Sequence, residues 1–241
     1  MRAIVIFVTA SLAAACASTT PGSRPSEMSA TSHEAEAKRH ADQASTHSAQ
    51  FDPKATEREE RCRGGRARAT SDTCWTSVTN PTSAHLEEAE RHRKMAADHR
   101  GGSKALQDAE ASACAGLDAD DRDTSPFDHR EDIVKSEALQ ATAPSVKGGS
   151  SQRVLGASVT IKAVPGLTKE YLQRLVNCHL ARNASMGFAM QEMASCPLSV
   201  KGASVTVESA GPSFRVDIRA DDSQAAVEIL RRAKSLTAEN K

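Results

Sequence analysis

The histidines of this chain are concentrated in two short segments that repeat each other. Six of the eight histidines lie in residues 33–47 and 85–99, where each segment has His at its first, eighth and fifteenth positions. Both segments also have Glu at position four, Ala at five, Arg at seven and Ala at twelve. Because imidazole and carboxylate groups bind zinc, copper and nickel, this repeat is the part of the chain best suited to metal chemistry.

Both segments are predicted to be helices. Ala, Glu, Lys and Arg dominate them, and neither contains Gly or Pro. Pro81-Thr82-Ser83 is typical of a helix start, and Gly101-Gly102 is a point where the second helix is expected to bend or break. A spacing of seven residues is nearly two helical turns, so the histidines of each helix form one stripe that also contains Glu36 or Glu88.

One stripe alone cannot hold a metal ion between successive histidines, because residues seven apart are separated by roughly 10.5 Å along a helix. Two antiparallel helices bring the stripes together in three rungs. The expected rungs are His33 with His99, His40 with His92, and His47 with His85. Each rung offers two imidazoles, with Glu36 or Glu88 as a third ligand at some levels, and under this metal-binding interpretation the cofactor is zinc or copper.

Two other interpretations of the stripes remain open. Seven residues is also the repeat of paired helices, so the histidines can be half-buried interface residues. Stacked imidazoles also repel each other once protonated, which suits a pH sensor. Apart from Leu86, Met95 and Leu106 the helices have little beyond Ala to bury, so they need the C-terminal unit, an oligomer or a membrane surface for stability.

Residues 1–15 have the parts of a secretory signal: one positive charge, a short apolar run and small residues before a cut point. The segment Leu12-Ala13-Ala14-Ala15-Cys16 resembles a bacterial lipobox. This resemblance implies cleavage after Ala15, acylation of Cys16 and attachment to a lipid bilayer; the alternative is an ordinary signal peptide cut near Ala15. For a Gram-negative source, Ala17 after the acylated residue implies the periplasmic face of the outer membrane. Residues 16–32 are expected to be a flexible tether.

The remaining cysteines are predicted to form disulfides, because a secreted chain meets an oxidising environment. The expected pairs are Cys62 with Cys74, around a loop rich in Gly and Arg, and Cys178 with Cys196. Cys114 is then free or available to another chain. The sequence has no Cys-x-x-Cys, which argues against a thioredoxin-like site.

The fold class expected for the whole chain is α+β. A helical hairpin occupies residues 33–116, an acidic loop and linker follow over 117–153, and a small domain extends over 154–241. In that domain, alternating patterns predict strands near 158–163, 205–207 and 214–218, and helices near 168–180 and 223–236. The order β-α-β-β-α predicts a two-layer sandwich with both helices on one sheet face. His179 lies on an apolar helix face and is interpreted as a core residue rather than a ligand.

Composition and motifs exclude some functions and favour others. With 31 basic and 31 acidic residues the chain has no electrostatic basis for binding nucleic acid, and it has no recognisable catalytic motif, so no enzyme is predicted. The layout resembles uncharacterised lipoproteins of bacterial envelopes. The predicted function is that of a membrane-anchored periplasmic lipoprotein acting as a non-catalytic binding or scaffolding module. The alternatives are metal binding or sensing through the histidine stripes, and an accessory subunit of an envelope complex, with an envelope protein or a second copy as partner.

Overall fold

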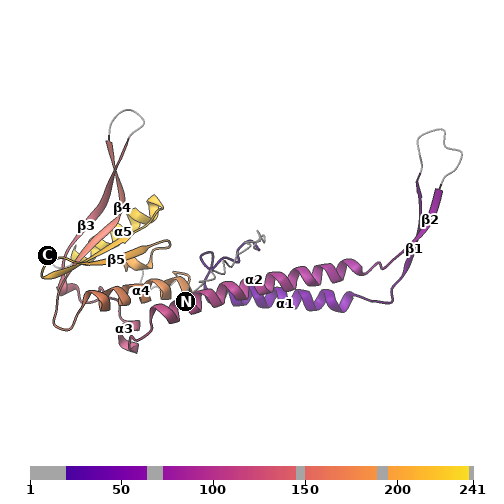
Figure 1. Cartoon of the computed structure of the whole chain (residues 1–241), viewed down its shortest axis with the longest axis horizontal. Coiled ribbons are helices and arrows are strands. Elements are labelled where there is room, and N and C mark those ends of the chain that lie inside the picture. The colour runs from indigo at the N-terminus through magenta and orange to yellow at the C-terminus, as the bar shows by residue number, and fades with distance from the viewer. Residues whose placement is uncertain (1–19, 64–72, 145–149, 189–194, 239–241) are drawn as a thin grey trace, which may run out of the picture.

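The computed structural model describes residues 20–63, 73–144, 150–188 and 195–238. It has the predicted α+β fold, with a long helical hairpin at one end and a sheet covered by helices at the other (Figure 1). The lipobox-like segment and the expected signal peptide fall outside the described residues. No helix within the described ranges is long and apolar enough to cross a membrane.

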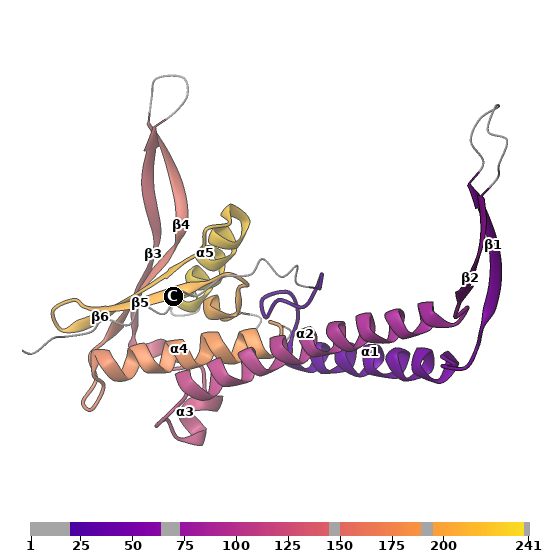
Figure 2. The same ribbon diagram turned by 45° about the vertical axis from the view of Figure 1, so that its right-hand side comes forward.

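The hairpin consists of α1 (Ala30–Gln50) and α2 (Ser83–Ala113), which lie side by side in both views (Figures 1 and 2). Its seam is built from buried alanines at repeat positions five and twelve, namely Ala37, Ala44, Ala89 and Ala96. These side chains are small, so the two backbones approach closely and the histidine stripes face each other. The Ser29 side chain caps α1 by accepting a hydrogen bond from the Ser32 amide.

Helix α2 continues through Gly101 and Gly102, so a helix break there is wrong. A Cβ atom on Gly102 would lie 2.6 Å from the Ser23 carbonyl oxygen and 2.9 Å from the His33 ring. Gly102 is therefore explained by close packing against the hairpin and not by a helix break. A Cβ atom on Gly101 would meet nothing within 4 Å.

A two-stranded antiparallel ribbon joins the helices, made of β1 (Glu57–Arg63) and β2 (Thr73–Thr79). It projects from the far end of the hairpin (Figure 1). The register places the Cα atoms of Cys62 and Cys74 opposite each other, and Cys74 is disulfide-bonded. The side chain of Cys62 lies outside the described part of the chain, so its predicted pairing with Cys74 stays a prediction. A cross-link here is valuable, because an isolated two-stranded ribbon is only marginally stable in water.

The C-terminal domain has a four-stranded antiparallel sheet in the order β3-β4-β6-β5. The strands are β3 (Ile133–Pro144), β4 (Ser150–Lys162), β5 (Ser204–Ser209) and β6 (Ser213–Arg219). Strand β3 was not part of the predicted β-α-β-β-α order, which becomes β-β-α-β-β-α. The acidic loop and linker expected over 117–153 are wrong where β3 spans Ile133–Pro144 and β4 begins at Ser150. Small and polar residues, which usually indicate loops, here form the outer parts of a β-hairpin.

Two helices, α4 (Lys169–Ser185) and α5 (Ser223–Ala238), pack on one face of this sheet. The core combines alternate residues of the central strands with one side of each helix, for example Val159, Val216, Val176 and Ile229. Thr168 caps α4 as the sequence predicted, by accepting a hydrogen bond from the Tyr171 amide.

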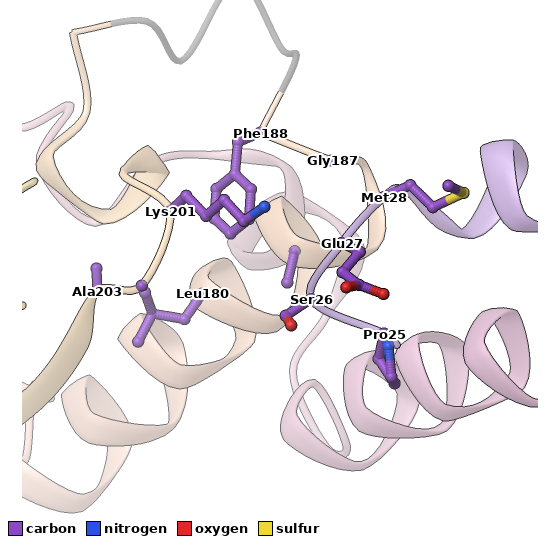
Figure 3. A pocket seen from close by; sticks show the side chains of 11 residues that line it. Pro25, Ser26, Glu27, Met28, Leu180, Gly187, Phe188, Lys201 and Ala203 are labelled. Atoms are coloured by element: carbon purple, nitrogen blue, oxygen red, sulfur yellow. The ribbon is translucent and has the colours of Figure 1, made fainter. Parts of the chain in front are cut away.

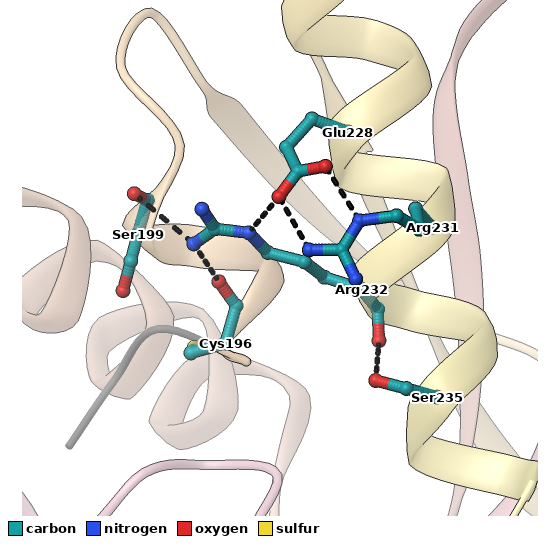
Figure 4. A network of polar contacts seen from close by, with 6 residues as sticks. All are labelled: Cys196, Ser199, Glu228, Arg231, Arg232 and Ser235. Carbon is teal, nitrogen blue, oxygen red and sulfur yellow. Dashed lines mark hydrogen bonds and ion pairs between the residues drawn. The ribbon is translucent and has the colours of Figure 1, made fainter. Parts of the chain in front are cut away.

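Helix α5 also fixes the short 3-10 turn η3 (Pro197–Ser199). Arg232 donates from Nη1 to the carbonyl oxygens of Cys196 and Ser199 at 3.2 and 3.4 Å (Figure 4). Glu228 accepts from Arg231 and Arg232, and these hydrogen bonds lower the pKa of Glu228 to about 2. The carboxylate stays ionised and holds the Arg232 side chain against the turn.

The hairpin and the C-terminal domain are joined where the end of α2 meets α4. A disulfide links Cys114, which caps α2, to Cys178 on α4. The predicted pair Cys178–Cys196 is therefore wrong, and Cys196 is a buried free thiol. Cys178 lies on the side of α4 that faces Cys114, Leu117 and Tyr171, whereas Cys196 belongs to the core beneath the sheet.

Residues 20–28, which we call the N-terminal strap, lie against α2 and not in a free tether. The Thr20 hydroxyl donates a hydrogen bond of 2.6 Å to Asp98 of α2, and α1 begins at Ala30. The flexible tether expected over 16–32 is therefore wrong for its described portion. Short polar and Gly-rich segments predict loops, but they do not tell whether a loop is packed on a helix.

Candidate metal centre

The three predicted rungs of histidines are present in the hairpin. The Nδ1 atoms face each other at 3.2 Å for His33 and His99, 3.0 Å for His40 and His92, and 3.2 Å for His47 and His85. All three pairs follow from one structural fact, which is that two copies of the same repeat lie antiparallel. Position one of each copy meets position fifteen of the other, and the eighth positions meet at the centre.

The rungs also stack on one another, so the six imidazoles form a continuous ladder. His40 stacks on His99 with ring centroids 5.7 Å apart, and His47 stacks on His92 at 5.6 Å. Each of these contacts joins one rung to the next. A change in the charge or position of one ring therefore changes the electrostatic environment and packing of the neighbouring rings along the seam.

The hydrogen bonds of the central rung define which nitrogen carries the proton. The Arg39 guanidinium lies 3.1 Å from His40 Nε2. Arginine can only donate, so a neutral His40 accepts at Nε2 and carries its proton on Nδ1. His40 Nδ1 then donates to His92 Nδ1, and this Nδ1–H···Nδ1 bond requires both rings to be neutral. Two protonated rings would place two donors face to face.

Two groups of three side chains could hold a metal ion within the described residues. Site one consists of Glu36, His40 and His99, and site two consists of His47, Glu88 and His92. In each group the ligand atoms lie within 4.8 Å of one another. The sites are copies, since each combines positions four and eight of one repeat with position fifteen of the other.

The grouping differs in one respect from the predicted arrangement of a Glu beside a single rung. Each Glu lies one helical turn before the His at position eight, so its carboxylate sits between two rungs. It therefore groups with one His from the central rung and one from an outer rung. His33 and His85, which were also predicted as ligands, complete the outer rungs but belong to neither group of three.

Each carboxylate of the two sites is held by an arginine three residues later in the same helix. Glu36 forms an ion pair with Arg39, and Glu88 forms the same pair with Arg91. The hydrogen bond from Arg39 holds the pKa of Glu36 below its usual range. Both carboxylates are thus oriented along the seam, and both arginines are exposed enough to move aside.

Burial favours the neutral form of three of the ladder histidines. Desolvation lowers the pKa values of His40, His92 and His99 from their ordinary range, and neighbouring cationic groups lower them further. A metal ion binds only the neutral imidazole, so a lowered pKa reduces the competition from protons near neutral pH. The same shifts make the seam sensitive to acid.

The other histidines have different surroundings. His179 is fully buried, and its Nε2 lies 3.3 Å from the Asp121 carbonyl oxygen, which supports its interpretation as a core residue. Desolvation lowers the pKa of His179, so the ring donates to that carbonyl as a neutral group. His129 is exposed beside Glu131, with 3.4 Å between His129 Nδ1 and the Glu131 carboxylate.

Sequence reasoning missed the residues that enclose one end of the ladder. Thr20, Asp98 and Gly102 connect the N-terminal strap to α2 around His33 and His99. The one available signal was Gly102 in an otherwise strong helix former, which was interpreted as a weak point. A Gly in a helix also marks a place where another part of the chain approaches closely.

Comparisons with family models, with curated protein sequences and with solved structures find no match to this chain. Its function must therefore be inferred from its residues and their geometry.

Proposed function

We propose that this protein binds transition-metal cations, zinc or copper, at sites one and two of the helical hairpin. The observation that carries this proposal is the pair of identical His₂Glu groups built around one histidine ladder. Each group combines two imidazoles and a carboxylate, a ligand set typical of zinc sites. Here the same three repeat positions converge twice, because each helix supplies two ligands to one site and one ligand to the other.

The spacing of the imidazoles supports this chemistry. Two nitrogens bound to a tetrahedral zinc ion lie about 3.3 Å apart when each bond is about 2.05 Å. Within each site the ligand atoms of the two histidines and the glutamate lie within 4.8 Å of one another, so side-chain rotations of modest size bring them to that spacing. A carboxylate completes a set of three protein ligands and leaves a fourth position for water or another molecule.

Electrostatics also favour cation binding at neutral pH. The pKa of Glu36 is lowered and those of His40, His92 and His99 are lowered as well, which favours the metal-binding forms of these four groups. A bound cation replaces the guanidinium that now pairs with each carboxylate. The exposed arginine then extends into water at little cost.

The cellular setting that we propose depends on the sequence pattern around Cys16. An acylated Cys16 would place the hairpin at the surface of a bacterial envelope membrane, as a non-catalytic binding module. In that setting the protein takes up metal in the periplasm, alone or as a subunit of an envelope complex.

A calorimetric titration of zinc and copper into the full chain tests the proposal. We expect about two cations per chain and release of protons on binding, because a minor protonated fraction of the ladder must be neutralised. The double variant His40→Ala with His92→Ala removes one ligand from each site and is expected to bind neither cation. His129→Ala is expected to bind like the parent chain, because His129 lies outside both groups.

Conservative carboxylate variants separate the two sites. Glu36→Gln and Glu88→Gln should each lose one binding event, while the exposed neighbours Glu34→Gln and Glu87→Gln serve as matched controls. Helix content measured by circular dichroism verifies that each variant is folded. Absence of binding in the parent chain, or binding that survives in the His40/His92 double variant, refutes the proposal.

A further inference from the structure

The two copies of the metal site have different surroundings. Site one lies at the end of the hairpin near the C-terminal domain, where its histidines His40 and His99 are 7% and 3% exposed and Glu36 is half-buried. At the other end, His47, Glu88 and His92 of site two are only half-buried. Because the ligands occupy the same repeat positions, the difference in burial must come from what covers each end.

The cover over site one is the N-terminal strap, residues 20–28. Thr20 binds Asp98 through its hydroxyl group at 2.6 Å and through its amide at 3.3 Å, and Asp98 immediately precedes the ligand His99. A Cβ atom on Gly22 would lie 4.0 Å from the Cε1 atom of His99. The strap thus passes directly over the site-one end of the ladder.

The strap is supported from its other side by the C-terminal domain. Residues 25–28 form one wall of a cavity of about 250 Å³, and the opposite wall includes Leu180, Phe188 and Lys201 (Figure 3). Close by, a Cβ atom on Gly187 would lie 2.8 Å from that of Ser29, which caps α1. Contacts on both sides therefore hold the strap in place.

Site two has no equivalent cover among the described residues. The repeat position that corresponds to Asp98 is Thr46, whose hydroxyl donates to the Asp42 carbonyl oxygen within its own helix. Beyond this end the chain leaves as the β1–β2 ribbon, which projects away from the hairpin (Figure 2). Solvent or another molecule can reach site two without displacing a packed segment.

We propose that the strap gives the two sites different rates of metal exchange, so that site one retains its metal ion and site two exchanges it. This inference rests on the proposed metal-binding function and specifies the site from which the metal ion is released. Loss of a bound cation requires an incoming ligand at the open coordination position. Site two offers that position to water, to a small chelator or to an imidazole or thiolate side chain of a metal acceptor, whereas site one must first lift the strap.

Rapid mixing of the zinc-loaded full chain with an excess of a chromogenic chelator tests this inference. The parent chain is expected to release zinc in two phases of equal amplitude. Glu88→Gln should remove the fast phase and Glu36→Gln the slow phase, which assigns each phase to its site.

Variants at the strap then test its role. Asp98→Ala and Thr20→Val should each accelerate the slow phase by about tenfold or more, the factor expected for loss of a hydrogen bond to a charged group. The matched control is Asp108→Ala, since Lys104–Asp108 and Lys94–Asp98 are equivalent i,i+4 pairs and only Asp98 binds the strap. Thr20→Val leaves α2 unchanged and so separates strap release from helix damage.

The outcomes of this experiment are distinct. Release of two zinc ions in a single phase overturns the proposed difference in exchange rate between the sites and leaves the proposed metal binding intact. Two phases that neither Asp98→Ala nor Thr20→Val alters overturn the role of the strap. A parent chain that holds no zinc overturns both the proposed function and this inference.

Discussion

The substitution Gly102→Ala tests the packing of the strap and the ladder most directly. On an exposed helix surface, Gly→Ala is expected to stabilise a protein by about 0.5–1 kcal/mol. At Gly102 the new Cβ atom would lie 2.6 Å from the Ser23 carbonyl oxygen, with two His33 ring atoms at 2.9 and 3.0 Å. The His33 ring is fully buried, so neither neighbour can move away freely.

The expected magnitude follows from these two opposing effects. Overpacking of a dense interior costs about 1–3 kcal/mol, which exceeds the gain in helix propensity. We therefore expect Gly102→Ala to lower the free energy of unfolding by about 1–2 kcal/mol. Gly101→Ala is the matched control, because its Cβ atom meets nothing within 4 Å, and it should raise stability by up to about 1 kcal/mol.

Thermal unfolding followed by far-ultraviolet circular dichroism measures both variants against the parent chain. For a chain of this size, 1 kcal/mol corresponds to about 2–4 °C in Tm, so the two variants should shift Tm in opposite directions. Equal stabilisation by both substitutions would refute the close approach of the strap and His33 to α2. In that case the cover over site one would lose its structural basis.

Two further predictions concern acid and the disulfide. Acid should destabilise the hairpin, because His40, His92 and His99 have lowered pKa values in the folded chain. Below about pH 6.5 the unfolded chain therefore binds more protons than the folded chain, and the free energy of unfolding falls as the pH falls through the lowered pKa values. Urea unfolding at a series of pH values checks this, and a midpoint that stays constant or rises on acidification would contradict it. Cys114→Ser should reduce stability by about 4 kcal/mol in the chain-entropy estimate, because the disulfide joins residues 64 apart in sequence. Cys196→Ser is the control for loss of a thiol without loss of a cross-link, and equal unfolding midpoints for Cys114→Ser and the parent chain would show that the cross-link is not stabilising.

The ladder was predictable because it depends on local periodicity and on one topological assumption. The seven-residue spacing fixes the stripe on each helix, and antiparallel pairing then sets all three rungs without free choice. Those rungs are confirmed by the facing Nδ1 atoms. Predicting that Glu36 and Glu88 each group with histidines of two rungs would require the position of each carboxylate along the helix axis. Sequence spacing gives that position only approximately.

The cysteine pairing could not be obtained in the same way. Sequence reasoning favoured Cys178 with Cys196 because both cysteines fall in the same C-terminal unit. The observed pair depends on where α2 packs against α4, and no pattern in either helix specifies that contact. Strand β3 was not predicted for a related reason: its outer residues, such as Gln140, Ala141 and Thr142, are small or polar and exposed, so burial leaves no alternation in the sequence.

The antiparallel repeat has a consequence for how such a ladder is assembled. A peptide with one copy of the repeat contains every group needed to build the whole ladder with a second identical peptide. Joining the two copies through β1 and β2 turns that bimolecular association into an intramolecular closure, so the ladder no longer depends on protein concentration. Joining the two copies in one chain also allows their sequences to differ. Asp98 and Gly102 can therefore be present at one end only, which an assembly of identical peptides could never achieve.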